Sequence, residues 1–421
     1  MRSMLLFAMM AAAVSSGAAP VIPEVSNVKC SKGPRYLTVT YDLSADAVVT
    51  LDIVTNGISV GEGVFAGFDK KGRRVVSGDV FRVVPAGKKR AVRWDVRAGW
   101  PDRIENIKAV VTAWPLNDKP PYMVVDISPD FSGDSEDRFR YYASSNGVPG
   151  GITENFLYKT NAIVFKRVYA RHRDYHGKLT NDFYLAVFET TQAQWATVCG
   201  SVTARFKKNG WGRPMDNATY CQMRLGKGHN SNYDNSTWYY PSEPHADSFL
   251  GLLRSRCGGV CDFDIPLKEQ WEFAAYAGHA NGYWGNGRPV TTSGKLGSVE
   301  EECPNLNTHG RYAKNGGFVP ANQAEYAVDF TAENDIDNGT AVVGSYEPND
   351  WGFYDMSGNV CERVHLADGS AKTVMGGDCH DTVRNCRPIV TRSDVSYTVT
   401  GYSYSNAPYT GIRISCRNGL K

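Results

Sequence analysis

Short runs of alternating apolar and polar residues fill the first part of the chain and constrain its fold more than any other feature. They include residues 36–41, 47–53 and 107–113, and turn-forming pairs such as Asn56-Gly57 separate them. Side chains alternate between the two faces of a strand, so these runs predict strands with one buried face. Strands at this spacing are typical of an all-β sandwich. We therefore predict that residues 20–118 form a sandwich of immunoglobulin or fibronectin type III topology.

An apolar run at the amino terminus predicts export. Arg2 precedes the run from Leu5 to Val14, and small residues follow as far as Ala19. This order is typical of a secretory signal peptide, here residues 1–19. The run is too short to span a bilayer, although an uncleaved anchor is the alternative. We expect a protein that is secreted or held in the periplasm or cell envelope, without a transmembrane segment after signal cleavage.

Size and composition narrow the possible organisation and partners. A chain of 421 residues is too long for one ordinary core and suggests at least two domains. Lysine and arginine number 46 against 44 aspartate and glutamate residues, which gives a formal charge of +2. Because nucleic-acid binding needs an excess of positive charge or a basic face, we expect no nucleic-acid partner.

All 10 cysteines lie beyond the predicted signal peptide. An exported protein folds in an oxidising compartment, so several of these cysteines are expected in disulfides. Cys257 and Cys261 are close enough in sequence to pair locally. A zinc site at these two thiols is the alternative, but neither a second thiol pair nor a clustered histidine accompanies them.

The chain changes character after the predicted sandwich. Residues 119–160 are rich in Ser, Gly, Asp and Pro, which predicts an ordered but irregular connector. Beyond it, residues 162–168 predict a strand, and Thr191 with Gln194 has the form of a helix capping box. A second predicted helix contains Trp271 and ends near Gly278, a plausible C′ position. Two helices among many Gly, aromatic and turn residues predict an irregular α+β domain over residues 161–421.

Four motifs follow one another in this second domain. The longest, W-G-F-Y-D-M-S-G-N-V-C-E at 351–362, puts two carboxylates around a tight Gly-Asn turn. With I-P-L-K-E-Q-W-E-F-A-A at 265–275, Gly376-Gly377 and G-I-R-I at 411–414, it resembles the ordered signature of the formylglycine-generating enzyme, or sulfatase-modifying factor, family. The domain is identified as a member of that family. The resemblance implies a variant of the C-type-lectin fold with little regular structure.

The resemblance also implies calcium. One site would combine the carboxylates of Asp355 and Glu362 with the main-chain carbonyls of Gly358 and Val360, an all-oxygen set that suits Ca²⁺. The alternative is that the aspartates are ordinary turn residues exposed to solvent. A second implied site would consist of Asn322 and Asp335 with the main-chain oxygens of Gln323 and Asp337.

The copper site of the family is where the resemblance breaks down. Active members oxidise a substrate cysteine to formylglycine with Cu(I) held by two cysteines, four and nine positions after the Gly-Gly. Counted from Gly377, the ninth position is Cys386, but the fourth is Asp381, and a hard carboxylate is a poor ligand for Cu(I). Cys379 stands two positions too early. Loss of the oxidation is therefore expected; a redox pair of Cys379 and Cys386 is the alternative.

Disulfides are the other role open to these cysteines. Cys379 and Cys386, with Cys361 in place of the usual tryptophan of the longest motif, would then be bridged. The family resemblance further implies a disulfide between Cys221 and Cys416 on the C-terminal strand.

Binding is the function that the sequence favours. Four tyrosines lie among Ser, Thr, Gly and Asn, a composition found in binding loops, although an ordinary packed loop is the alternative. They are Tyr397, Tyr402, Tyr404 and Tyr409. We expect an exported calcium-binding module that engages a protein or glycan surface. The alternatives are a divergent copper-dependent oxidase that matures sulfatases and a structural component of an envelope or extracellular assembly.

Overall fold

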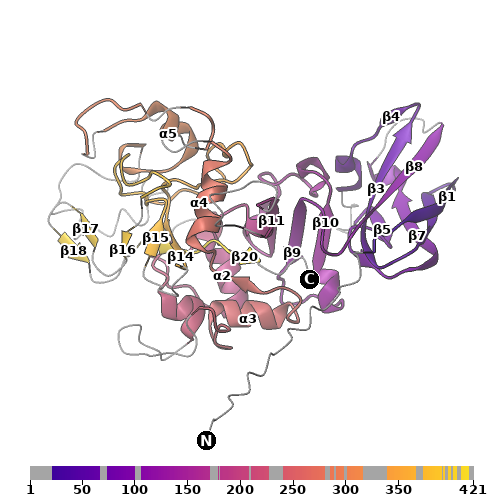
Figure 1. The fold of residues 1–421 in the computed structure, drawn as a ribbon, viewed down its shortest axis with the longest axis horizontal. Helices are drawn as coiled ribbons and strands as arrows, with labels where there is room; N and C mark the ends of the chain where they lie inside the picture. Colours follow the sequence, from indigo (N-terminus) through magenta and orange to yellow (C-terminus); the bar gives the residue numbers. More distant parts are fainter. Residues whose placement is uncertain are drawn as a thin grey trace, which may run out of the picture.

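The computed structural model shows a mainly β protein with a few short helices (Figure 1). It describes residues 21–66, 74–99, 106–170, 179, 181–207, 210–226, 240–279, 285–288, 291–297, 301–315, 339–366, 373–390, 392–393, 397–399, 402–404 and 409–416. The predicted signal peptide lies outside these residues. Within the described part of the chain, no helix has the length and apolarity needed to cross a membrane.

The N-terminal strands form two antiparallel sheets. One has the order β1-β2-β7-β5; in the other β3 pairs with β4, β6 and β8. The alternation predicted for residues 36–41 is confirmed, because Leu37, Val39 and Tyr41 are buried. The strands are β1 (Val25–Lys32), β2 (Tyr36–Leu43), β3 (Ala47–Thr55), β4 (Ile58–Ser59), β5 (Val76–Gly78), β6 (Val83–Val84), β7 (Gly87–Asp95) and β8 (Ile107–Trp114). Inward side chains of both sheets share one hydrophobic cluster. The finer topology stays a prediction.

Part of the predicted connector is not irregular. β9 (Tyr122–Asp126) and β10 (Phe139–Tyr142) pair with each other, and β9 also pairs with β11 (Ala162–Val168). The six-stranded sheet β10-β9-β11-β12-β20-β13 is completed by β12 (Phe183–Ala186), β13 (Phe263–Asp264) and β20 (Ser415–Cys416). The turn-rich composition around these strands hid two short strands, which pair with each other and, through β9, with β11 of the next domain.

The helices of the second domain are short. α2 (Gln192–Cys199) begins with the predicted capping box: Thr191 accepts from the Gln194 amide, and the Gln194 side chain accepts from the Thr191 amide. The predicted Trp271 helix is α4 (Lys268–Tyr276), and Gly278 follows it at φ 83°. The N-terminal part contains α1 (Val96–Gly99) and the short helical turn η1 (Glu62–Ala66). The remaining helices are α3 (Phe249–Arg256) and α5 (Pro304–His309), and the remaining short helical turns are η2 (Ser135–Arg138), η3 (Ser145–Gly147), η4 (Phe156–Lys159), η5 (Gly210–Gly212), η6 (Cys221–Leu225) and η7 (Ala313–Asn315).

A smaller sheet carries the motif residues. β14 (Cys361–Val364) pairs with β15 (Thr373–Met375) and, in parallel, with β19 (Thr410–Gly411); β16 (Arg392–Ser393) pairs with β15. β17 (Tyr397–Val399) and β18 (Tyr402–Tyr404) form a separate hairpin. The sheet therefore joins segments that are up to about fifty residues apart in the chain.

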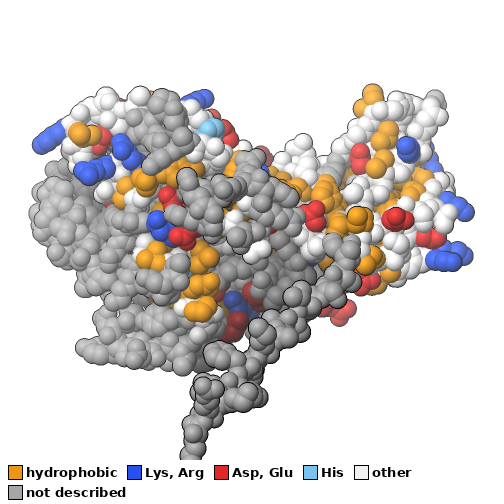
Figure 2. Space-filling view, in the orientation of Figure 1, with side chains coloured by type: hydrophobic (Ala, Val, Ile, Leu, Met, Phe, Trp, Pro, Cys, Tyr) orange, Lys and Arg blue, Asp and Glu red, His pale blue; other side chains and the backbone are white. Residues whose placement is uncertain are grey.

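The N-terminal sheets and the second domain share buried contacts. The hydrophobic cluster of the two sheets also contains Val124 of β9, Val164 of β11 and Phe188. The Phe81 ring packs on Tyr142 with 5.2 Å between centroids, and the Phe81 carbonyl accepts from the Tyr141 amide. On the face seen in Figure 2, acidic and basic side chains are interspersed over the N-terminal sheets, in agreement with the balanced charge.

Candidate functional site

A buried ion pair brings three of the four motifs together. Glu362 of β14 accepts from Arg413 at 2.9 Å (Nε to Oε2) and 2.6 Å (Nη2 to Oε1). Trp271 of α4 donates its Nε1–H to Glu362 Oε2 at 2.5 Å. Arg413 also donates to the carbonyls of Ala186, Val187 and Tyr354. All three residues are 0 % exposed, so both charges of the pair need compensation inside the protein, to which Glu189 and Asp355 also contribute near Arg413.

A second carboxylate, Glu189, holds the tight turn of the longest motif. Its Oε2 accepts from Asn359 Nδ2 at 2.6 Å and its Oε1 accepts from the Val360 amide at 3.1 Å. Asn359 adopts a left-handed conformation, and its Oδ1 accepts from the Ala341 amide. Sequence reasoning missed Glu189. The sequence contains one signal that could have found it: an acidic residue directly follows the apolar segment 183–188. An acidic residue next to a buried segment needs a buried partner.

Asp355 completes an acidic cluster with Glu189 and Glu362. Its Oδ2 accepts from the Gly344 amide at 2.7 Å, whereas its Oδ1 is buried and makes no hydrogen bond. Burial raises the pKa of Asp355 to about 6, and the Glu362 carboxylate adds to the rise. Burial and the carboxylates of Asp355 and Glu362 raise the pKa of Glu189 well above its usual range. Arg413 and Lys159 are the cations that act on Asp355. Three carboxyl groups share the cluster with two cations, and the raised pKa values show that burial and mutual repulsion favour the protonated forms of Asp355 and Glu189.

The segment after Gly376-Gly377 is a tight turn closed by Asp381. The Asp381 carboxylate accepts from the Asp378 amide at 2.8 Å and from Asn385 Nδ2 at 3.0 Å. Gly377 has φ 71°, and a side chain there would meet the Asn385 carbonyl at 2.8 Å. The Gly-Gly pair is therefore required for the chain to pass this close to Cys386. Asp381 has a structural role in this turn.

Asp378, Cys379 and His380 are the only described residues that form a group of three ligand-type side chains with all ligand atoms within 4.8 Å of one another. These atoms already have partners: Asp378 Oδ1 accepts from the His380 amide at 2.9 Å, and Cys379 Sγ lies 3.2 Å from His380 Nδ1. Burial lowers the pKa of His380 to about 3, and its ring stacks on Tyr409 at 4.1 Å. The group is buried, and its polar atoms are engaged in contacts within the protein.

Cys379 and Cys386 lie in different hydrophobic clusters. Cys379 packs with Phe206 and Tyr409, whereas Cys386 packs with Leu306, Tyr312 and other residues around α5. Both cysteines are 0 % exposed. Burial, with a further contribution from the Asp378 carboxylate, raises the pKa of the Cys379 thiol well above its usual value. Because the thiolate is the nucleophile and the metal ligand, a thiol in this environment is inert at neutral pH.

A pocket of about 200 Å³ opens elsewhere, beside the start of the longest motif. Lys166, whose pKa is lowered by burial, donates from Nζ to the Trp351 carbonyl and lies 5.4 Å from the centre of the Tyr122 ring. Aromatic rings and the Lys166 side chain thus meet in one concave surface, whereas the Arg167 guanidinium is buried in ion pairs with Asp118 and Asp182. Its lining residues are Lys166, Arg167, Val168, Tyr169, Trp351 and Phe353.

The comparison with known families agrees with this arrangement. Residues 148–419 match the sulfatase-modifying factor enzyme 1-like domain. The chain belongs to this family. The four motifs lie within this match, and the contacts of Glu362 with Arg413 and Trp271 link three of them.

Individual relatives are distant. Chaperone protein LppX of Paenibacillus barcinonensis is 28 % identical over 196 residues, a match that covers 43 % of this chain and 61 % of LppX. Among solved structures, Treponema denticola variable protein 1 is 16 % identical, covers 61 % of this chain and 95 % of its own, and has a TM-score of 0.36. CarF is 15 % identical, covers 56 % of this chain and 87 % of its own, and has a TM-score of 0.32.

The structure brings together part of the calcium set that the family implies. Asp355 and Glu362 act on each other electrostatically within the acidic cluster, but Glu362 already accepts from Arg413 and Trp271. Gly358 and Val360 lie in the turn between them, and the Gly358 amide donates to the Gly376 carbonyl. The second set, Asn322, Gln323, Asp335 and Asp337, lies outside the described residues.

The sulfur atom that contacts Cys416 is that of Cys261, whereas the family resemblance implies Cys221 as the partner. Cys416 Sγ lies 2.9 Å from Cys261 Sγ, and Cys221 is a buried residue of η6. The structure contains no disulfide among the cysteines, all of which lie in the described part of the chain. Antiparallel pairing of β13 with β20 brings Cys261 there, and that pairing was not visible in the sequence.

Of the four tyrosines predicted to form a binding loop, Tyr409 is placed in the interior. It is 6 % exposed and stacks on His380 and Phe206. Its environment is therefore that of a packed residue, the alternative interpretation of the loop. Tyr397, Tyr402 and Tyr404 lie on the β17–β18 hairpin, and their side chains lie outside what the structure describes.

Proposed function

We propose that this protein is an exported binding module of the sulfatase-modifying factor family that has lost copper-dependent cysteine oxidation. One observation carries the proposal. Asp381, at the position of one copper-binding thiol, uses its carboxylate to close the turn through the Asp378 amide and Asn385. Because the Asp381 carboxylate is engaged in these hydrogen bonds, the turn is better suited to a structural role than to metal binding.

The cysteines support the same proposal. Cys379 and Cys386 are buried in separate clusters, and the raised pKa of Cys379 opposes thiolate formation. Cu(I) needs two soft thiolates that can approach one ion together. Two fully buried thiols, one of which has a raised pKa, therefore favour binding over the alternative of a divergent oxidase.

The copper proposal is tested by titrating free thiols in the native, exported protein and by measuring Cu(I) binding. We expect Cys379 and Cys386 to stay unlabelled while the partly exposed Cys30 and Cys199 react, and no difference in Cu(I) uptake between the wild type and Cys386→Ser. Rapid labelling of both Cys379 and Cys386, with copper uptake that disappears in Cys386→Ser, would establish the oxidase alternative instead.

We infer that the pocket lined by Lys166, Trp351 and Phe353 contributes to ligand binding. Aromatic rings supply rigid contact area, and Lys166 supplies a donor for carbonyl, hydroxyl or acidic groups. These features suit a protein or glycan surface. The name of the relative LppX, a chaperone protein, favours a protein ligand.

The ligand proposal is tested with the immobilised full chain, offered arrayed glycans and purified exported proteins of the same cell. Saturable binding that Trp351→Ala weakens at least tenfold is expected. Trp211→Ala is the matched control, because Trp211 is 64 % exposed and lies on η5, away from the pocket lining. Self-association without a saturable ligand would favour the structural-component alternative.

Calcium binding at Asp355 is a further part of the proposal. A bound cation would satisfy the unpartnered Oδ1 of Asp355 and relieve the repulsion among the carboxylates. An ion that binds only the folded state raises the melting temperature by mass action. We expect calcium to raise it in the wild type and not in Asp355→Asn, which keeps an acceptor for the Gly344 amide. An equal calcium response in both proteins would exclude this site.

A further inference from the structure

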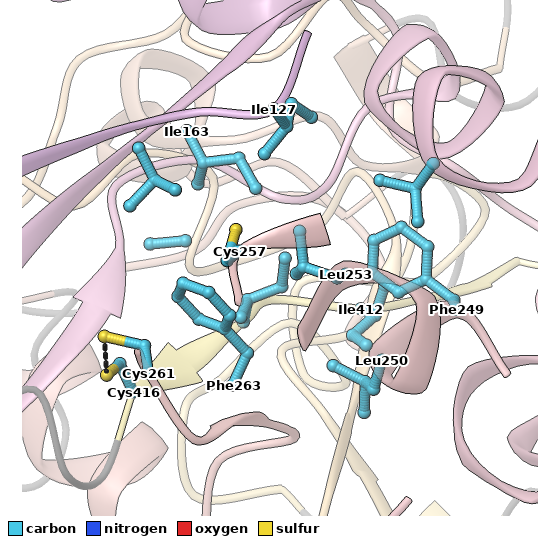
Figure 3. Close-up of a cluster of buried hydrophobic side chains, with 14 of the residues drawn as sticks. Ile127, Ile163, Phe249, Leu250, Leu253, Cys257, Cys261, Phe263, Ile412 and Cys416 are labelled. Carbon is cyan, nitrogen blue, oxygen red and sulfur yellow. Dashed lines mark hydrogen bonds between the residues drawn. The ribbon is translucent and has the colours of Figure 1, made fainter. Parts of the chain in front are cut away.

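We propose that Cys261 and Cys416 form a structural disulfide that closes the six-stranded sheet. Their sulfur atoms lie 2.9 Å apart (Figure 3). In cells the bond depends on the proposed export, because the cytosol keeps thiols reduced. The pairing itself is a property of the fold and is testable with purified protein.

Two local features bring Cys261 to Cys416. β13 is antiparallel to β20, with Phe263 opposite Cys416 and Asp264 opposite Ser415. Between the end of α3 and β13, Gly258 and Gly259 have φ values of 62° and 71°. These left-handed residues turn the chain so that Cys261 approaches the sheet immediately before β13. The pair is thus held by backbone pairing on one side and a glycine turn on the other.

The surroundings are those of a structural rather than a reactive pair. Cys261 is 2 % exposed and Cys416 is 0 % exposed, and both belong to the main hydrophobic cluster of the second domain. Phe263, which lies beside them in Figure 3, stacks on Phe165 at 5.5 Å. A disulfide here would be shielded from reductants once the sheet has formed.

Cys257 is the competing partner. It is 0 % exposed, belongs to the same cluster, and was paired with Cys261 in the sequence-based expectation. In the structure Cys257 is the C-cap of α3, on the far side of the glycine turn from Cys261. The sulfur atom in contact with Cys261 Sγ is that of Cys416, so the structure favours the long-range pair over the local one.

Formation of the bond requires a disulfide oxidant, either a small molecule or a thiol–disulfide exchange protein. One cysteine thiolate attacks the oxidant disulfide, forms a mixed disulfide and releases the first thiolate of the oxidant. The second cysteine thiolate then attacks the protein sulfur of the mixed disulfide and releases the other oxidant thiolate. Two protein thiols lose two protons and two electrons, and one oxidant disulfide becomes two thiols. Because both sulfurs are buried in the fold, we place these steps before the sheet closes.

The bond would join residues 155 positions apart and restrict the unfolded chain over that length. For loops of this size, we expect the bond to raise the melting temperature by on the order of 5–10 °C. Reduction under denaturing conditions followed by refolding in reductant should remove that increment.

The test uses the full chain refolded with oxidised glutathione, alkylated, digested with trypsin without reductant and analysed by mass spectrometry. We expect the peptide 414–417 to be linked to the peptide 257–268. Fragment ions that separate Cys257 from Cys261 assign the linkage in the wild type, so the result does not depend on a variant that folds. Cys261→Ser should abolish the link, whereas Cys257→Ser and Cys221→Ser should retain it.

A link from Cys416 to Cys221 or Cys257, or an unlinked Cys416 after complete oxidation, would overturn the inference. These outcomes are independent of ligand binding and copper uptake. The inference can therefore fail while the proposed function stands, and the reverse also holds.

Discussion

Glu362 is the residue on which the buried network depends most. It accepts from both Arg413 and Trp271, and all three side chains are fully buried. Glu189 and Asp355 also act on Arg413, but Glu362 is the carboxylate that is bonded to it. Because breaking a buried, bonded ion pair is costly, we expect Glu362→Gln to lower the free energy of unfolding by about 3–5 kcal/mol. Chemical denaturation measures this. Asp137→Asn, in partly exposed pairs with Arg82 and Arg140, should cost under about 1 kcal/mol; equal losses would contradict the assignment.

Asp355 should make stability depend on pH. Its pKa is about 6 in the fold against an ordinary value of 3.8, so the folded state binds a proton more tightly than the unfolded chain. The stabilisation that comes from this proton is therefore complete below about pH 4 and is lost as the pH rises through about 6. The free energy of unfolding should fall by on the order of 2–3 kcal/mol over this range. Denaturation from pH 4 to 8 should show a smaller decline in Asp355→Asn. If calcium binds there, it should restore stability to the wild type at high pH.

At the scale of elements, the turn of the longest motif lies against the segment after α5. Gly358 has φ 82°, and a Cβ at this position would meet the Arg311 carbonyl at 2.1 Å. We expect Gly358→Ala to cost at least about 3 kcal/mol, because backbone on both sides must move. Gly200, the C-cap of α2, has a similar φ of 77°, but a Cβ added there would have no atom within 4 Å. Gly200→Ala should therefore lower the free energy of unfolding by only about 1 kcal/mol. A denaturant titration of both variants separates the cost of the left-handed backbone conformation from the cost of the steric clash with Arg311.

At the scale of the whole molecule, the N-terminal sheets and the family domain are coupled through a common core. The sequence predicted a separate sandwich, yet Val124, Val164 and Phe188 belong to its hydrophobic cluster. We expect calorimetry of the full chain to show one main unfolding transition. Phe81→Ala, which removes the ring that packs on Tyr142, should shift that transition downward without splitting it. Two well-separated transitions, of which only one responds to Phe81→Ala, would show that the two parts unfold independently.

Much of the fold could be predicted because its signals are local. The alternation in β2, the capping box at Thr191 and the Trp271 helix each depend on neighbours within a few residues. β9 and β10 were missed because short strands in a turn-rich segment become visible only through their partners. Glu189 was missed for the same reason, since Asn359 and Val360, its partners, follow it by 170 and 171 positions.

By itself, the sequence determined the family of this protein, because motif order and residue identity are properties of the linear chain. Tertiary structure alone decided that Glu362 pairs with Arg413, that Asp355 keeps an unpartnered buried oxygen, and that Cys261 lies against Cys416. These outcomes depend on strand pairing and burial between segments far apart in the chain. Burial sets the cost of each unpaired charge, and strand pairing sets which sulfur atoms can meet.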